Sequence, residues 1–84
     1  MELHEMVQGI QSRADLVAFI EALTEDLRSH PERWENQTLD QYLEALGSWL
    51  DDSGGFYRNQ GLEVPTSPSW KTVADMLIAA TMYE

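Results

Sequence analysis

The 84-residue sequence contains no cysteine. A disulfide framework, a thiolate metal site and a cysteine nucleophile are therefore excluded, and the fold depends on packing alone. The absence of cysteine suits a reducing compartment, so we expect a cytoplasmic protein. Residues 1–10 lack the basic and apolar regions of a secretory signal, and no stretch approaches the ~20 apolar residues of a membrane-spanning helix. We therefore expect no membrane association.

Basic residues are also few, because 5 Lys and Arg stand against 15 Asp and Glu and the formal net charge is −10. A negative field of this size repels phosphate-rich polymers, so we expect no nucleic-acid partner. Hydrophobic residues make up 43% of the chain, which favours a folded core over a disordered segment. The length accommodates one such core, and we predict a single helical domain over residues 1–84.

The sequence lacks the alternating pattern of β-strands and shows helical spacing instead. Leu3, Met6, Val7 and Ile10 share this spacing, but Gly9 weakens so short a segment and limits it to a short N-terminal helix. A longer helix is predicted from Ser12 to Ser29. It begins at a capping pair, Ser12 with Asp15, and ends before Pro31. Its apolar seam contains four residues, Leu16, Ile20, Leu23 and Leu27.

A third helix is predicted from Thr38, which forms a capping pair with Gln41, to about Asp52. Its apolar seam contains four leucines, and we expect this seam to face the core. Ser53, Gly54 and Gly55 are predicted to stop the helix, because glycine favours the backbone conformation of a C-terminal cap. Residues 56–66 are then expected to form the longest loop. The four seam leucines are Leu39, Leu43, Leu46 and Leu50.

The last helix is predicted to begin at Ser67, with Pro68 in the first helical position. It is apolar around most of its circumference, through Trp70, Val73, Leu77 and their neighbours, so we expect it to be the central and most buried element. The predicted fold class is all-α, a small helical bundle of three main helices plus a short N-terminal helix.

Groups able to carry out catalysis are scarce. His4 and His30 are the only histidines, and neither has a nucleophile at a recognised spacing. The acidic run that starts at Asp51 fails as a calcium loop, because Phe56 occupies the glycine position and Leu62 the position of the bidentate glutamate. Carboxylate pairs at helical spacing lack the Glu-x-x-His motif of di-iron bundles. We expect no enzymatic activity, no catalytic residue, no metal and no cofactor.

Aromatic and polar residues are the strongest candidates for a binding surface, since Trp, Tyr and Arg dominate interface hot spots. The candidate binding residues are Trp34, Tyr57, Arg58, Asn59 and Trp70. A structural interpretation is also open, in which Trp34 and Trp70 cover the ends of the bundle and Trp49 packs inside. Arg58 could equally anchor its loop through a helix carboxylate.

Several short motifs give the chain a family likeness. They are Trp34-Glu35-Asn36, Thr38-Leu39, Tyr57-Arg58-Asn59-Gln60-Gly61, Pro68-Ser69-Trp70 and Tyr83-Glu84. With them, almost the whole chain resembles a family of small acidic bacterial proteins classified as a domain of unknown function. The resemblance implies a compact domain and supplies no established activity and no catalytic residue.

A weaker likeness is to the immunity proteins of nuclease colicins, which are acidic four-helix domains. In that family paired aromatics precede a Ser-Pro-Ser segment, and Phe56-Tyr57 and Ser67-Pro68-Ser69 occupy comparable places here. The chain departs from the pattern at the aromatic site, because that family has two tyrosines and a proline where this chain has Phe56, Tyr57 and Arg58, and the loop here is longer. Shared fold by itself does not establish shared function.

The negative charge is concentrated between Ala14 and Tyr57, where ten acidic and two basic residues give a net charge of −8. Such a surface speeds association with a basic protein, although it also serves solubility alone. We predict a non-enzymatic protein-interaction module with a basic protein partner, in its sharpest form an immunity or antitoxin protein. The alternative is a small-molecule-binding or enzyme-accessory domain that uses the loop Phe56 to Thr66. A homo-oligomer is a further possibility.

Overall fold

The computed structural model describes residues 2–83, so Met1 and Glu84, the last residue of the Tyr83-Glu84 motif, lie outside the described residues. Every regular element in this range is helical. The elements are α1 (Leu3–Gln8), α2 (Arg13–Ser29), the 3₁₀ helix η1 (Pro31–Arg33), α3 (Leu39–Asn59) and α4 (Trp70–Ala79). The predicted all-α bundle of three main helices and a short N-terminal helix is confirmed. No helix among residues 2–83 has the length and hydropathy needed to cross a bilayer.

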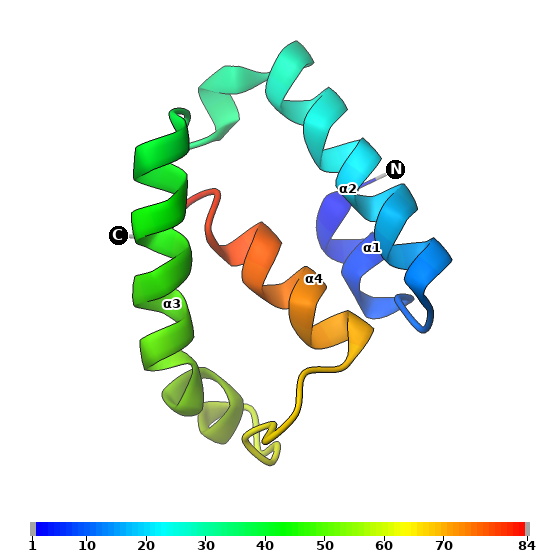
Figure 1. Ribbon diagram of the computed structural model, residues 1–84, viewed down its shortest axis with the longest axis vertical. Coiled ribbons are helices and arrows are strands. Elements are labelled where there is room, and N and C mark those ends of the chain that lie inside the picture. The colour runs from blue at the N-terminus through cyan, green and yellow to red at the C-terminus, as the bar shows by residue number, and fades with distance from the viewer. Residues whose placement is uncertain (1, 84) are drawn as a thin grey trace.

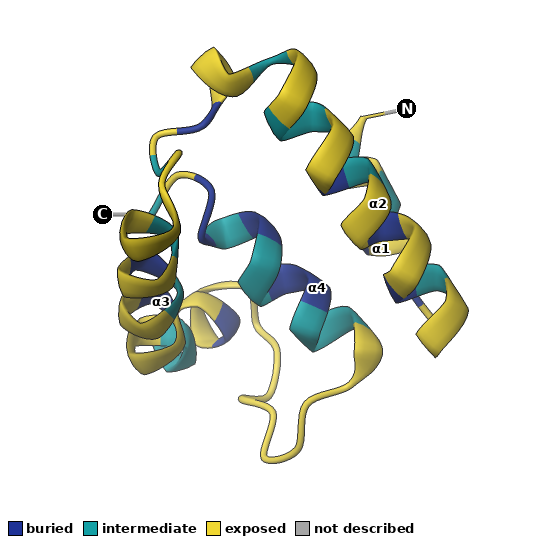
Figure 2. Ribbon diagram, turned by 45° about the horizontal axis from the view of Figure 1, so that its top comes forward, coloured by how far each residue is buried: buried dark blue, intermediate teal, exposed yellow. Residues whose placement is uncertain are grey.

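Helix α4 is the centre of the bundle, as predicted. It packs against α1, α2 and α3, and it lies between α3 on one side and the α1–α2 pair on the other (Figure 1). The backbones of α2 and α3 are not in contact with each other. Ala74 and Ala80 are completely buried, because their small side chains allow the surrounding elements to approach α4 closely. Figure 2 shows the contrast between the largely covered α4 and the exposed outer faces of the other helices.

The core lies mainly between α4, α1 and α2. Phe19 is the largest side chain in it that is fully buried, and Leu16, Leu23 and Ile78 pack around it. The predicted α2 seam is correct at Leu16 and Leu23, whereas Ile20 is 42% exposed. The difference arises because α2 packs on α1 as well as on α4, which rotates the buried face toward Phe19 and away from Ile20.

The predicted start of α2 and its end before Pro31 are confirmed. The Asp15 backbone N–H donates to Ser12 Oγ at 3.1 Å. The Asp15 carboxylate accepts from the backbone N–H of Gln11 at 3.0 Å, one residue before the position of a standard capping box. His30, which precedes the proline, forms the C-cap. The predicted Thr38 cap of α3 is also present, since the Gln41 N–H donates to Thr38 Oγ1 at 3.4 Å.

The predicted helix stop at Ser53, Gly54 and Gly55 is wrong, because α3 continues to Asn59. A glycine in a helix interior costs only about 1 kcal/mol relative to alanine. Aromatic packing beyond the glycines offsets this cost, since the ring of Trp49 lies 5.4 Å from that of Phe56 and 6.3 Å from that of Tyr57. Residues 56–59 are therefore helical rather than part of a loop.

The glycine that ends α3 is Gly61, whose φ of +73° is left-handed. Its N–H donates to the Arg58 carbonyl at 3.0 Å, and the Leu62 N–H donates to the Tyr57 carbonyl at 3.0 Å. These two bonds form a complete Schellman motif. The mechanism of termination was predicted correctly from glycine chemistry, but at the wrong glycine.

The predicted start of the last helix at Ser67 is wrong by two residues. Ser69 is the N-cap, because its Oγ accepts from the Thr72 N–H at 3.0 Å. Pro68 therefore precedes the cap instead of occupying the first helical position. A serine lies on each side of this proline, and it is Ser69 whose hydroxyl accepts a hydrogen bond from the first turn of the helix.

The predicted α3 seam is wrong for three of its four leucines. Leu39, Leu43 and Leu50 are 74%, 53% and 51% exposed, and Leu46 is half-buried. In this part of α3 the face toward α4 instead carries Ala45 and Trp49, both buried, and Tyr57 is buried near the C-terminal end of the helix. Because the aromatic face has the larger area to bury, it takes the position next to α4 and leaves the leucines without a partner.

The buried role of Phe19 provides a test of the core. We expect Phe19→Ala to lower the free energy of unfolding by about 3–5 kcal/mol, because it removes a fully enclosed ring and leaves a cavity. Urea unfolding followed by circular dichroism measures the change. Val17→Ala on the same helix, at a half-exposed position, is the matched control and should change stability by less than about 1 kcal/mol. Equal losses in the two variants would contradict this description of the core.

Candidate functional site

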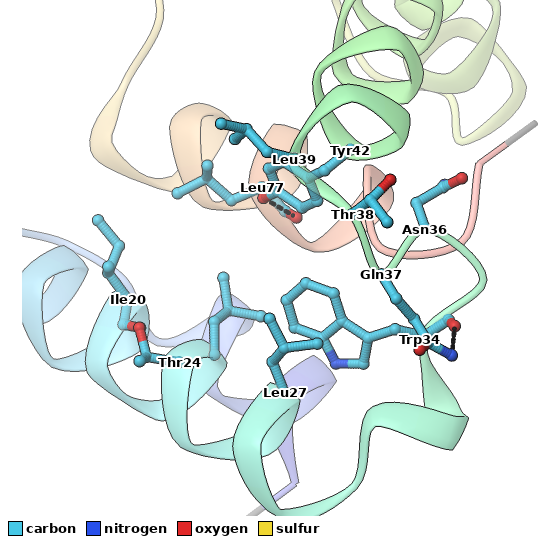
Figure 3. Close-up of a pocket in the computed structure, with 11 residues that line it drawn as sticks. Ile20, Thr24, Leu27, Trp34, Asn36, Gln37, Thr38, Leu39, Tyr42 and Leu77 are labelled. Atoms are coloured by element: carbon cyan, nitrogen blue, oxygen red, sulfur yellow. Dashed lines mark hydrogen bonds between the residues drawn. The ribbon is translucent and has the colours of Figure 1, made fainter.

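An apolar groove of about 350 Å³ opens between α2 and α3 above α4, and we call it the α2–α3 groove. Side chains from both helices point into it, and Leu77 of α4 lies beside Leu39 and Tyr42 (Figure 3). Leu39 and Tyr42 come from α3. The wall from α2 consists of Ile20, Leu23, Thr24 and Leu27. The groove exists because α2 and α3 both pack on α4 but not on each other.

Trp34 closes one end of the groove. Its indole Nε1–H donates to Asp26 Oδ2 at 2.8 Å, and only 8% of the residue is exposed. Its ring stacks on that of Tyr42, with centroids 5.9 Å apart and an interplanar angle of 26°. The hydrogen bond to α2 and the stacking on α3 hold Trp34 between the two helices.

Tyr42 presents its ring to the groove and its hydroxyl to the protein. The hydroxyl donates to the Leu77 carbonyl at 2.7 Å, and burial raises the pKa of Tyr42 to about 12. The polar atoms of both aromatic residues are thus satisfied inside the protein. What remains for a ligand is an apolar and aromatic surface, which suits binding rather than proton transfer.

Exposed leucines continue along α3 from Leu39, the leucine of this helix that lines the groove. Leu39, Leu43 and Leu50 lie on the same face of the helix, and together with Val17 and Ile20 of α2 they form what we call the apolar rim. These five residues are between 42% and 74% exposed. Single exposed apolar residues are common on protein surfaces, whereas a row of them beside an apolar groove forms a continuous apolar patch.

The five residues predicted as a binding site do not form one surface. Trp34 lines the groove, whereas Trp70 lies at the first residue of α4, 41% exposed, with the Arg13 guanidinium 5.6 Å from its ring centre. These two tryptophans lie near opposite ends of α4, because Asn36, two residues after Trp34, bonds to the Ala80 carbonyl at 3.0 Å. Helix α4 is about 15 Å long.

The remaining three predicted residues lie in the last turn of α3. Tyr57 is buried, and its hydroxyl donates to Asp75 Oδ2 at 2.9 Å. Arg58 and Asn59 are exposed, and the Arg58 guanidinium lies over Gly54, where a Cβ would be 3.1 Å from its nitrogen. Trp49 is buried, as the structural interpretation of the tryptophans predicted. The groove takes no lining residue from Phe56–Thr66.

Asp75 is a buried carboxylate that sequence reasoning missed. Lys71, one turn earlier on α4, pairs with it at 3.1 Å, and Tyr57 supplies a second partner. Burial, followed by the hydrogen bond to Asp75, raises the pKa of Tyr57 to about 12. This cluster ties the end of α3 to α4 and so holds the two helices at the spacing that the groove needs. The only signal of this cluster in the sequence was the spacing of four residues between Lys71 and Asp75 on one helix.

Asp26 and Leu77, which hold Trp34 and Tyr42 by hydrogen bonds, were also missed as site residues. Asp26 is eight residues from Trp34 along the chain, and Leu77 is 35 residues from Tyr42. No local spacing connects such pairs. Among residues 2–83, no group of three or more His, Cys, Asp or Glu side chains is arranged to hold a metal ion. His30, at the C-cap of α2, lies 3.5 Å from a Glu32 carboxylate oxygen.

Residues 12–84 match the Family of unknown function (DUF7660). The chain belongs to this family. The DUF7660 match begins at Ser12, the N-cap of α2, so it includes α2, α3, α4 and every residue of the groove, while α1 precedes it. No curated protein and no solved structure matches the chain.

The buried tyrosines predict a loss of stability at alkaline pH. Their pKa is about 12 in the folded protein, against an ordinary value of 10.0. Because the unfolded phenols ionise first, their contribution to folding is complete below pH 10 and is lost as the pH rises toward 12. We expect the free energy of unfolding to fall across this range, and Tyr42→Phe to make the fall smaller. Urea unfolding at several pH values measures it, and a fall of unchanged size in the variant would contradict the burial of this phenol.

Proposed function

We propose that this protein is a non-enzymatic protein-interaction module that binds a basic protein partner through the α2–α3 groove. The observation that carries the proposal is the exposure of Leu39, Leu43 and Leu50 beside the groove. Full burial of a leucine side chain contributes about 1.5–3 kcal/mol. A partner that covers this row therefore gains a large part of the binding free energy of a specific complex.

Aromatic residues strengthen the case for the groove as the contact surface. Trp and Tyr are enriched at the centres of protein interfaces, where they lie in well-packed pockets. Trp34 and Tyr42 occupy this position in the groove and are already held in place by their hydrogen bonds. A rigid aromatic surface loses little conformational entropy when a partner binds.

Charge supports a basic partner. The net charge is −10, and the segment between Ala14 and Tyr57, which contains both walls of the groove, carries ten acidic and two basic residues. Long-range attraction to a basic protein raises the association rate, and this effect weakens as salt is added.

An immunity or antitoxin role is the sharpest form of this proposal. It is supported by the acidic surface, since acidic inhibitors find basic nucleases by the same electrostatic attraction. The aromatic pair that carries the likeness to colicin immunity proteins lies outside the groove, and of the two residues Tyr57 is buried whereas Phe56 is 38% exposed. A gene for a secreted toxin or nuclease beside this one would support the role, and a metabolic operon would count against it.

A small apolar or aromatic molecule is a second candidate occupant. The groove volume of about 350 Å³ falls at the lower end of the range for small-molecule pockets. The sequence predicted such a ligand site at Phe56–Thr66, whereas we now propose it in the groove, which has no lining residue from that segment. A thermal-shift screen against a metabolite library tests it, and stabilisation that disappears in Tyr42→Ala would favour it over a protein partner.

The groove can be tested by removing leucines from it. We expect the double variant Leu39→Gln and Leu43→Gln to lose at least tenfold in affinity for the partner, because it removes two apolar contacts. A loss of about 1.4 kcal/mol in binding free energy is sufficient for a tenfold loss in affinity. The measurement is affinity capture from the source cell at low salt, followed by mass spectrometry. The decisive readout is a basic protein retained by the unmodified chain and lost by the variant.

A matched control comes from the connection between α3 and α4. Leu62 and Val64 are 51% and 39% exposed and lie outside the groove. The double variant Leu62→Gln and Val64→Gln makes the same chemical change and should retain the partner. Equal loss in both double variants, or capture of proteins that does not depend on salt, would overturn the proposal.

A further inference from the structure

The α3 leucine seam has the spacing of a helix–helix contact but no helix packs on it. Leu39, Leu43, Leu46 and Leu50 follow one another at steps of four, three and four, which is the spacing of the contact positions in a coiled coil. Three of the four are more than half exposed. In the described part of the chain, α3 packs against α4 alone, through a different face.

We infer that the occupant of the α2–α3 groove is a basic amphipathic helix of the partner protein. This inference rests on the proposed function and states what kind of segment binds. The leucine row from Leu39 to Leu50 is about 16 Å long, which corresponds to three helical turns. Helix α4 already lies between α2 and α3 (Figure 1) and contributes Leu77 to the groove, and a second helix placed against Leu77 and the leucine row would complete the packing.

The charge around the leucine row selects a basic segment. On α3 the exposed acids Asp40, Glu44 and Asp51 lie beside the leucines in the helical register, and the first base of this helix is Arg58. The α2 wall is less acidic than α3, because Glu21 and Arg28 on its exposed side offset each other and Glu25 lies at a separate hollow beside α1. The basic face of the bound helix should therefore point toward α3 rather than α2.

A second copy of this chain fits the groove poorly. Each copy carries a net charge of −10. A second copy would offer the same leucine row as its apolar surface. Pairing the two rows would bring Asp40, Glu44 and Asp51 of one copy against the same acids of the other. Like charges brought together in this way oppose association. The charge pattern therefore favours a different protein of opposite sign.

The test uses the full chain labelled with ¹⁵N and a synthetic 14-residue peptide of leucine and lysine, with leucines at steps of four, three and four. The three tryptophans give three indole N–H signals in the NMR spectrum, which act as reporters at known positions. We expect the peptide to shift the signal of Trp34 and the backbone signals of Leu39 and Leu43. The signal of Trp70, near the opposite end of α4, should not move.

Two further peptides separate pattern from charge. A scrambled peptide of identical composition lacks the apolar face and should bind at least tenfold more weakly. A peptide with glutamate in place of lysine keeps the apolar face and should not bind. The inference would be overturned if the patterned and the scrambled leucine–lysine peptides bound equally well, or if only the Trp70 signal shifted. It would also be overturned, in favour of a second copy, if the protein signals shifted with protein concentration in the absence of peptide.

Charge variants test whether the acids beside the leucine row are the ones that matter. Glu44→Gln with Asp51→Asn and the control Glu25→Gln with Glu63→Gln remove the same number of charges, so the two proteins have equal net charge. Glu25 lies at a separate hollow beside α1, and Glu63 lies in the connection after α3. We expect about fivefold weaker peptide binding in the first pair and little change in the control. Equal weakening would show that only the overall charge acts.

Failure of this inference is distinguishable from failure of the proposed function. If the peptide does not bind but Leu39→Gln with Leu43→Gln still removes a cellular partner, the module remains and the helical occupant is wrong. If neither effect is seen, both are wrong.

Discussion

The packing of one short apolar helix against three others is the constraint on which this structure depends. Helix α4 is the element that α1, α2 and α3 share, and the fully buried alanines Ala74 in the helix and Ala80 at its C-cap allow close approach. Because α2 and α3 pack on α4 from opposite sides, neither covers the other. The groove between α2 and α3 exists because both helices pack on α4, which is 10 residues long, and not on each other.

Hydrogen bonds between distant residues hold the walls of this groove in place. The side chain of Asn36 bonds to the carbonyls of Ala80 and Tyr83, Tyr42 bonds to the carbonyl of Leu77, and Tyr57 bonds to Asp75. All four bonds join the segment around α3 to α4 or to the residues just after it. Each satisfies a polar atom that would be costly to bury alone. They leave the apolar side of α3, with its leucines, turned away from the core.

Local signals predicted the helices well and the faces of α3 poorly. The caps at Ser12 and Thr38 and the stop before Pro31 depend on residues within one turn, and all three are present. The end of α3 was misplaced because packing of Phe56 and Tyr57 on Trp49 outweighs the preference of Gly54 and Gly55. Of the predicted binding residues, only Trp34 lies in the groove.

The sequence by itself determined an acidic, all-α, single-core protein with an apolar final helix, because composition and helical period are local properties of the chain. Only the tertiary structure decided which face of α3 is buried. Both its leucine face and its aromatic face are apolar, and the period of a helix does not rank them. The aromatic face lies against α4, where Tyr57 also meets Asp75, and this choice turns a predicted core seam into an exposed apolar surface.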